Sequence, residues 1–489
     1  MKEIICLLCF IIFNYKLNSV GFNLSNKSAS FKISSGSNFV LNSSINAVSG
    51  KIVQESGAAI SGNNINFTSG SFYDGDSKIK ISGTMNFGEL KSIILDGGKN
   101  FEGKRGDILQ SISISGSDNV LEGVLFTVQD INLADSNSGV LISLRNRLDA
   151  NINLNNGTLN IDEDLFFLDG KRIVGPGKVN ISGHKLSFGS KDLVWQEPIL
   201  FEEASDVDLN ANVTLENTWS FRGLSVCRGN ANILNLSCDD CFVVRPNSNL
   251  LIHDLILYGL SDNKIRCLTD TSTITLRNVK LIQSGNFTFT RGTLVFADYV
   301  EFVGNGKTIT YQSAMPCIIK QNAVVYFDTG FTFSYAPITN NRKLIQFEDD
   351  TATIYLNGAN LYSSYVGMDL IGGNLIVNKN SNIFIKEYDY STGISGQIQV
   401  GTGGTGKDFK IHILSGSQLN VDTGYFVYNN VSASSFNAIN NSSFFKFGNS
   451  ARLNLEQPLN MSLGRMFIGN SLTNVITNTY NFSGMIFSY

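Results

Sequence analysis

The chain has 489 residues, a length that commonly corresponds to about three domains. Only 16% of its residues are charged and Pro occurs 6 times, whereas Gly occurs 46 times and hydrophobic residues make up 42%. This composition predicts a folded chain of many short strands and turns, and it argues against intrinsic disorder. A formal net charge of −4 without a Lys/Arg cluster argues against a nucleic-acid partner.

Residues 1–21 are typical of a secretory signal peptide. The apolar run Ile4–Phe13 is too short to cross a bilayer as a helix, which takes about 20 residues. The small residues Ser19 and Gly21 suit a cleavage site. We therefore predict an exported protein, secreted or held at the cell surface, with no integral membrane span. A hydrophobic first strand is the alternative interpretation.

Residues 22–150 contain short runs of alternating apolar and polar residues that end in Ser-Gly turns. The spacing of these runs is irregular. We interpret this segment as the less regular N-terminal part of one all-β domain that covers residues 22–489. The Ser-Gly turns directly follow Val48, Ile60, Ile81 and Ile114.

A clearer repeat covers residues 150–460. Each copy has apolar residues at its first and third positions and a polar or turn-forming residue at its fifth position. A further apolar residue usually stands at the eighth position. The spacing between neighbouring copies is often nearly constant, and we interpret the much longer step from Leu375 to Leu419 as two coils. Copies of this pattern begin at Leu159, Val179, Leu250, Ile274, Val324, Ile354 and Leu419.

This repeat predicts a right-handed parallel β-helix, or β-solenoid, with coils of about 20–24 residues. Alternation at period two makes each copy a half-buried strand, and the Asn, Asp or Gly that follows tolerates the backbone of a sharp corner. One such unit cannot bury its inner face alone, but stacked units can. Residues 461–489 would then form a C-terminal cap or edge. Serial β-sandwich domains are the alternative, since they share short strands and turns.

The coil pattern over residues 150–460 resembles the parallel β-helix proteins as a class. That class includes pectate lyases, polygalacturonases, phage tailspikes and autotransporter passenger domains. The resemblance implies the fold and export. The chain matches no motif of a particular family, so the resemblance assigns no functional residue.

Cys238 and Cys241 have the two-residue spacing of a zinc knuckle or a redox pair. A tetrahedral zinc site needs two more ligands, and the sequence has no second close Cys or His pair, so we predict no metal site. A disulfide at this corner is one interpretation, with Cys227 or Cys267 as rival partners. Two free, partly buried thiols are the interpretation that we favour.

Asp239 and Asp240 lie between these cysteines and raise the question of glycoside hydrolysis, because β-helix polygalacturonases use clustered aspartates. In those enzymes a Gly-His-Gly motif follows the Asp pair and an Arg-x-Lys comes later. Here His184 precedes the pair, and only Lys264-Ile-Arg266 lies downstream. Inverting hydrolysis also needs two carboxyl groups about 6.5–9.5 Å apart, one of them protonated. We therefore predict no catalytic residue at this pair.

The three histidines, His184, His253 and His412, fall on separate predicted coils, and two of them occupy outward or corner positions. No Gly-x-Ser-x-Gly turn accompanies any of them, so we predict no serine triad. The repeat places Ile252 inside the solenoid and His253 outside, and His253→Asp is expected to be tolerated.

The segment Gly401–Gly406, followed by Lys407, is one residue short of a phosphate-binding loop. Asp408 takes the place of the required hydroxyl residue and would repel phosphate, and an alternating strand follows instead of a helix. We interpret the segment as a glycine-rich loop between coils and predict no cofactor. Tyr388 and Tyr390 form either an exposed aromatic pair or a packing contact.

The sequence favours an exported β-solenoid with an adhesive or structural role that is not an enzyme. Glycans or cell-surface proteins are the partners that we expect of such a surface. A polysaccharide hydrolase or lyase is the first alternative, and it predicts that carboxylates from several coils converge on one face. A passenger domain delivered by a separate barrel is the second alternative.

Overall fold

The computed structural model describes residues 108–124, 127–148, 150–168, 171–202, 204–386, 396–403, 407–440, 442–457, 459, 463–468 and 486–487, together with strands between residues 16 and 103. It divides into two compact units. Unit 1 comprises residues 1–192 and 196–205, and unit 2 comprises residues 193–195 and 206–489. The predicted signal peptide lies outside the described residues except for Lys16–Leu17, which form strand β1.

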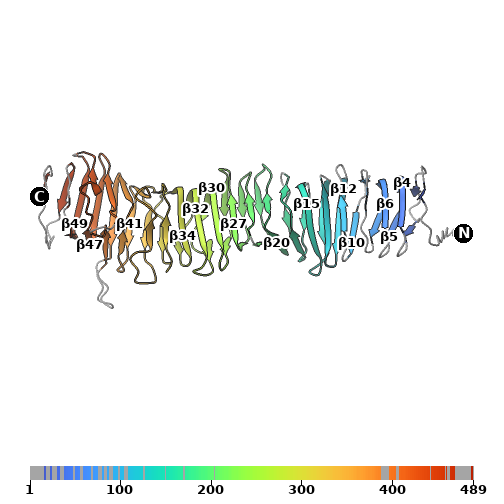
Figure 1. Ribbon diagram of the computed structural model, residues 1–489, viewed down its shortest axis with the longest axis horizontal. Helices are drawn as coiled ribbons and strands as arrows, with labels where there is room; N and C mark the ends of the chain where they lie inside the picture. Colours follow the sequence, from blue (N-terminus) through green and yellow to red (C-terminus); the bar gives the residue numbers. More distant parts are fainter. Residues whose placement is uncertain are drawn as a thin grey trace. The chain divides into compact units, whose positions relative to one another are not determined.

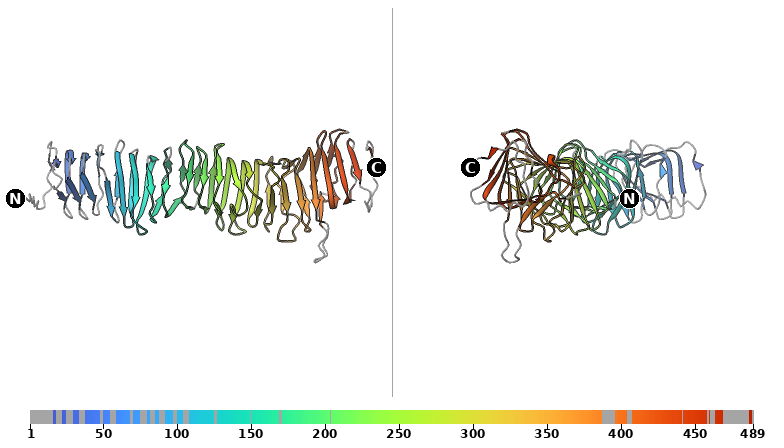
Figure 2. Two further views of the ribbon diagram at one scale, coloured as in Figure 1. Left: turned by 180° about the vertical axis from the view of Figure 1, so that it is seen from behind. Right: turned by 60° about the vertical axis from the view of Figure 1, so that its left-hand side comes forward.

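Each unit is a parallel β-solenoid, in which successive coils place their strands side by side (Figure 1, Figure 2). In unit 1, one coil leads from Ile112 to its register partner Ile131, and the next leads from Ile131 to Ile152. The three residues belong to β12 (Ile108–Ser115), β14 (Thr127–Leu133) and β16 (Asn151–Asn153). A second sheet of unit 1 contains β13 (Asn119–Val124), β15 (Gly139–Leu148), β17 (Thr158–Ile161) and β20 (Lys178–Ser182).

The most regular coils of unit 2 follow the predicted repeat. Ile252 pairs with Leu276 and Leu276 with Phe296, so that both coils have a length within the predicted range. The parallel pairing rules out serial β-sandwiches, whose sheets are antiparallel. The strands concerned are β27 (Leu224–Arg228), β30 (Asn249–Leu260), β32 (Thr273–Gln283) and β34 (Thr293–Phe302).

Some later coils of unit 2 are longer than predicted, and the interpretation of the step from Leu375 to Leu419 is wrong. Leu375 pairs with Ile411 of the next coil, whereas Leu419 pairs with Ser381 in a different sheet. The two copies of the pattern therefore mark two sides of the solenoid. The single long coil contains β45 (Gln397–Val400), which pairs with β42 (Met368–Leu370) of the preceding coil.

The core of unit 2 lies inside the coils and is built from stacked rows of apolar side chains. Ile252 is fully buried and Leu276 is 5% exposed. Burying such a side chain stabilises the fold by about 1.5–3 kcal/mol. Aromatic rings continue the stacking, as with Phe289 and Tyr311, whose centroids lie 5.8 Å apart in nearly parallel planes.

The corners form where the repeat places its polar residue. Asp254 and Asn278 adopt φ values of 54° and 52°, and Gly183 and Gly358 also have positive φ. Asn, Asp and Gly accept this left-handed conformation at the lowest cost. Each corner therefore turns the chain within one residue and keeps the flanking strands in register with the next coil.

Candidate functional site

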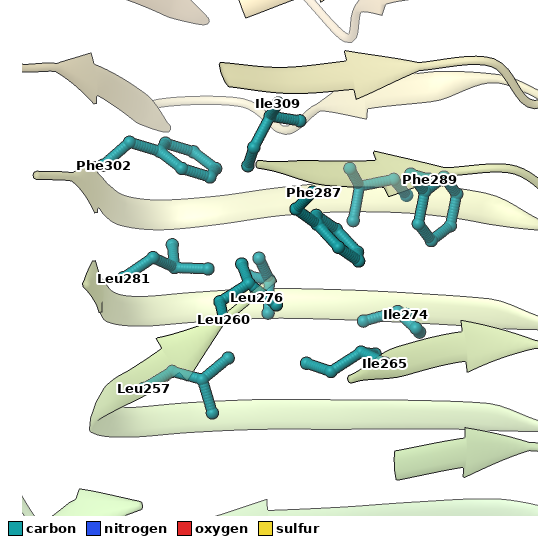
Figure 3. Close-up of a pocket in the computed structure, with 11 residues that line it drawn as sticks. Leu257, Leu260, Ile265, Ile274, Leu276, Leu281, Phe287, Phe289, Phe302 and Ile309 are labelled. Carbon is teal, nitrogen blue, oxygen red and sulfur yellow. The ribbon is translucent and has the colours of Figure 1, made fainter. Parts of the chain in front are cut away.

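A cavity of about 20 Å³ lies inside the coils of unit 2, in the apolar core (Figure 3). Leu257, Leu276, Phe287 and Phe302 are among the residues that line it, and all of its lining side chains are aliphatic or phenyl. An apolar void of this size stays dry, because water there would find no hydrogen-bond partner. The cavity is a packing void and offers a ligand no polar contact.

Cys238 and Cys241 are joined in a disulfide that closes the turn between β28 (Ile233–Leu236) and β29 (Phe242–Val244). The favoured interpretation of two free thiols does not describe this structure. Among the other described cysteines, Cys227 is free and fully buried. Burial, assisted by the negative charge of Asp208, raises the pKa of Cys227 to about 12. Such a thiol is unreactive at neutral pH.

Asp239 and Asp240 each meet a cation of the next coil. Lys264 Nζ lies 3.4 Å from Asp239 Oδ1, and Arg266 Nε lies 2.7 Å from Asp240 Oδ1. Both aspartates stand at the disulfide corner, where Asp240 adopts a φ of 50°. The two carboxylates therefore hold neighbouring coils together as ion pairs.

The three histidines lie on separate coils. His184 Nδ1 is 3.8 Å from Asp164 Oδ1 at the surface of unit 1. His412 lies on β46 (Lys410–Ile413), where burial and the nearby charge of Lys410 lower its pKa. Within the described part of the chain, no group of three or more His, Cys, Asp or Glu side chains is arranged to hold a metal ion.

His253 is not a surface residue, and the sequence-based expectation is wrong there. It lies on the outer side of β30 but is only 2% exposed. Its neighbours in register on the adjacent coils are Arg228 and Arg277. Their long side chains cover the outward-facing imidazole ring of His253 and shield it from water.

The His253 ring has a partner at each nitrogen. Arg228 Nε donates to His253 Nε2 at 3.2 Å, so Nε2 carries no proton and Nδ1–H donates to Asp254 Oδ2 at 2.8 Å. Arg228 also lies 3.4 Å from Asp208 Oδ1. The hydrogen bond from His253, together with contributions from Asn278 and Arg277, lowers the pKa of Asp254. The imidazole links Arg228 of the preceding coil to Asp254 in a hydrogen-bonded network between coils.

The glycine-rich segment is described at Gly401–Gly403 and again from Lys407, and residues 404–406 lie outside the described part. Asp408 Oδ2 accepts hydrogen bonds from Ser432 N and Ser435 Oγ, both at 2.7 Å. Burial opposes its ionisation, but these hydrogen bonds together lower its pKa. Asp408 therefore anchors the 3-10 helix Ala433–Ser435 of the following coil. The strand β46 comes next, as predicted, and it leaves no helix N-terminus for a phosphate.

A feature that the sequence reasoning missed is a row of tyrosines on the outer face of unit 2. Tyr299, Tyr326 and Tyr355 come from β34, β37 (Val324–Phe327) and β40 (Thr353–Asn357), three successive coils. The ring centroids lie 6.2 Å apart for Tyr299 and Tyr326, and 5.0 Å apart for Tyr326 and Tyr355. We call these three residues the tyrosine strip. Tyr388 and Tyr390, the pair considered from sequence, lie outside the described residues.

Polar side chains border the tyrosine strip. Asn357 Nδ2 donates to Asp328 Oδ1 at 2.8 Å, and Asn378 Nδ2 donates to Asn357 Oδ1 at 2.9 Å. Beside Tyr326 in register stands Glu301, whose carboxylate lies 2.9 Å from Lys280 Nζ. The strip thus combines an aromatic ridge with a hydrogen-bonded row of amides and carboxylates.

The hydroxyls of Tyr299 and Tyr326 stay protonated well above neutral pH. Burial, assisted by the negative charge of Glu301, raises the pKa of Tyr299 to about 12. Burial and the charge of Asp328 likewise raise the pKa of Tyr326. Each of these hydroxyls can therefore donate a hydrogen bond under physiological conditions.

Comparison of the chain with family models, curated proteins and solved structures finds no match. Among the described residues, no helix has the length and apolar character needed to cross a membrane. The fold class that the structure defines is the parallel β-solenoid.

Proposed function

We propose that the protein is an exported β-solenoid, secreted or held at the cell surface, with an adhesive or structural role and no enzymatic activity. The observation that carries this proposal is the pairing of charged groups between coils. Lys320 Nζ lies 2.9 Å from Glu348 Oε1 across one coil step, in the same manner as Lys280 and Glu301. Carboxylates in such pairs act as ties between coils, which suits a stiff scaffold that presents side chains on a broad surface.

Two features support export. The segment Ile4–Phe13 has the length and apolar character of a signal-peptide core. The disulfide between Cys238 and Cys241 suits an oxidising compartment, since cytosolic reductants keep most thiols reduced.

Expression of the full chain with a C-terminal tag tests the location. We expect tagged protein in the medium or accessible to added protease on intact cells, with the segment Met1–Gly21 removed. Retention of the uncleaved chain inside the cell would contradict export.

Beads coated with the secreted protein test the role. We expect them to bind cells or immobilised glycans more than beads coated with an unrelated secreted protein. Incubation with a panel of neutral and acidic polysaccharides should release no reducing ends and no unsaturated sugars. Sustained release of either product would establish the hydrolase or lyase alternative instead.

A further inference from the structure

We propose that the tyrosine strip binds an uncharged polysaccharide chain in an extended conformation. This inference rests on the proposed adhesive role and names the surface and the ligand class for it. It concerns Tyr299, Tyr326 and Tyr355, with Glu301 and Asp328 at their side.

The first argument is exposure. Tyr299 is 43% exposed, and Tyr326 and Tyr355 are half-buried on the same outer face. A contiguous apolar surface on a soluble protein marks an interaction site more often than single exposed side chains do. Tyrosine has an apolar ring and a polar tip, which suits a partner with both kinds of surface. A pyranose ring is such a partner, because its C–H groups form apolar faces and its hydroxyls lie at the rim.

The second argument is the repeat. Tyr326 and Tyr355 pair directly in the register of β37 and β40, and Tyr326 pairs with Glu301 of β34. Tyr326 and Tyr355 therefore stand one coil spacing apart, about 4.8 Å in a parallel sheet, and Tyr299 continues the row on a third coil, two residues away from the register position. An extended polymer of similar residues can contact several coils in the same way, whereas a compact small molecule would use one.

The third argument is charge. Glu301 is paired with Lys280 at 2.9 Å, and Lys379 and Lys280 lie near enough to Asp328 to favour its ionised form. The carboxylates bordering the strip therefore have cations close by. Burial is the main cause of the raised pKa of Tyr299, and the negative charge of Glu301 adds to it. An anionic polysaccharide gains little at such a surface. Hydroxyl groups can donate to the carboxylates and accept from the tyrosine hydroxyls, which suits an uncharged sugar.

The test uses affinity electrophoresis of the full secreted chain in gels that contain one polysaccharide each. The uncharged probes are laminarin, hydroxyethylcellulose, arabinoxylan and dextran, and the charged probes are alginate and chitosan. We expect at least one uncharged probe to retard the protein, with alginate and chitosan weaker.

The decisive variants are Tyr326→Ala and Tyr355→Ala. Each should weaken binding about tenfold, the loss expected on removing a central aromatic contact. Tyr258→Ala is the matched control, because Tyr258 is 48% exposed on β30 but pairs in register with Ile282, away from the strip. Its binding should stay within about twofold of the unchanged protein. Tyr326→Phe keeps the aromatic ring and should retain most of the binding. It tests the role of the ring even where the Ala variant fails to fold.

The outcomes separate this inference from the proposed function. Retardation that the Tyr326→Ala, Tyr355→Ala double variant leaves unchanged would overturn the strip as the binding surface. Lack of retardation by every uncharged probe, or preference for alginate or chitosan, would overturn the ligand class. In each of these cases the bead adhesion assay still decides on the adhesive role by itself.

Discussion

Side chains on the inner and outer sides of the same strand, β30, are buried by different neighbours. Ile252 faces inward and is fully buried among apolar side chains of neighbouring coils. His253, the next residue, faces outward and yet is only 2% exposed, since Arg228 and Arg277 stand beside it in register. In a parallel solenoid, side chains on the outside stack on one another at the coil spacing as they do on the inside. Period-two alternation therefore predicts which way a side chain points, but it does not predict whether water reaches it.

The largest contrast between the two sides is expected for a charge placed on each. Ile252→Asp buries a carboxylate without a partner and should prevent unit 2 from folding, at a cost above about 5 kcal/mol. Ile256→Asp lies on the outer face of the same strand, beside Lys280 in register, and should cost about 1 kcal/mol or less.

Unfolding in guanidinium chloride, followed by tryptophan fluorescence, measures both variants. The chain has 2 tryptophans, and Trp195 and Trp219 are both fully buried in unit 2. Similar destabilisation by the two substitutions would contradict the assigned orientation of β30.

A smaller effect is expected at His253, where the structure reverses the expectation of tolerance. His253→Ala removes the acceptor for Arg228 and the donor for Asp254, and it should cost unit 2 about 2 kcal/mol. The change in denaturation midpoint, with an unchanged denaturant slope, is the measurement. His253→Gln keeps one of the hydrogen bonds and should recover part of the loss. A His253→Ala protein as stable as the unchanged chain would show that the network contributes nothing.

The sequence was sufficient for the fold class and for most inward-facing positions, because apolar alternation and corner residues record the stacking directly. Leu250, Ile252, Ile274 and Leu276 were all assigned correctly to the core. One copy was placed one residue out of register. It begins at Val324, but in the structure Val325 and Phe327 face inward while Val324 and Tyr326 face outward.

The reason for that error also explains why the tyrosine strip was missed. Residues 324–327 are all apolar or aromatic, so alternation cannot choose a face there. Alignment of this segment with the sequence of the next coil would have identified the inward face. Ile354 and Leu356 follow Val325 and Phe327 at the same spacing along the chain. That alignment places Tyr326 beside Tyr355 on the outside. The network around His253 carried no comparable signal, because its members come from coils whose lengths differ.

The smallest effect concerns the pH dependence of the outer network. The pKa of Asp254 is lowered in the folded state, chiefly by the hydrogen bond from His253. In the unfolded chain the pKa of an aspartate is about 3.9. A group with a lowered folded-state pKa contributes stability that is fully present above the unfolded value and is lost as the pH falls through the folded value. Asp254→Asn removes this contribution, so the variant should be modestly less stable than the unchanged protein at pH 7.

That difference should shrink as the pH is lowered from about 4 toward 2, where the unchanged protein also loses its carboxylate. Asp298→Asn is the matched control. Asp298 occupies the equivalent corner of β34 with a φ of 54°, and its carboxylate lies 3.9 Å from Arg277 Nε without a histidine partner. Denaturation midpoints from pH 7 to pH 2 should converge more for the Asp254 variant than for the Asp298 variant. If the two variants showed the same pH profile, the hydrogen bond from His253 would not be the main cause of the lowered pKa of Asp254, and the contacts that both corners share would account for the pH dependence.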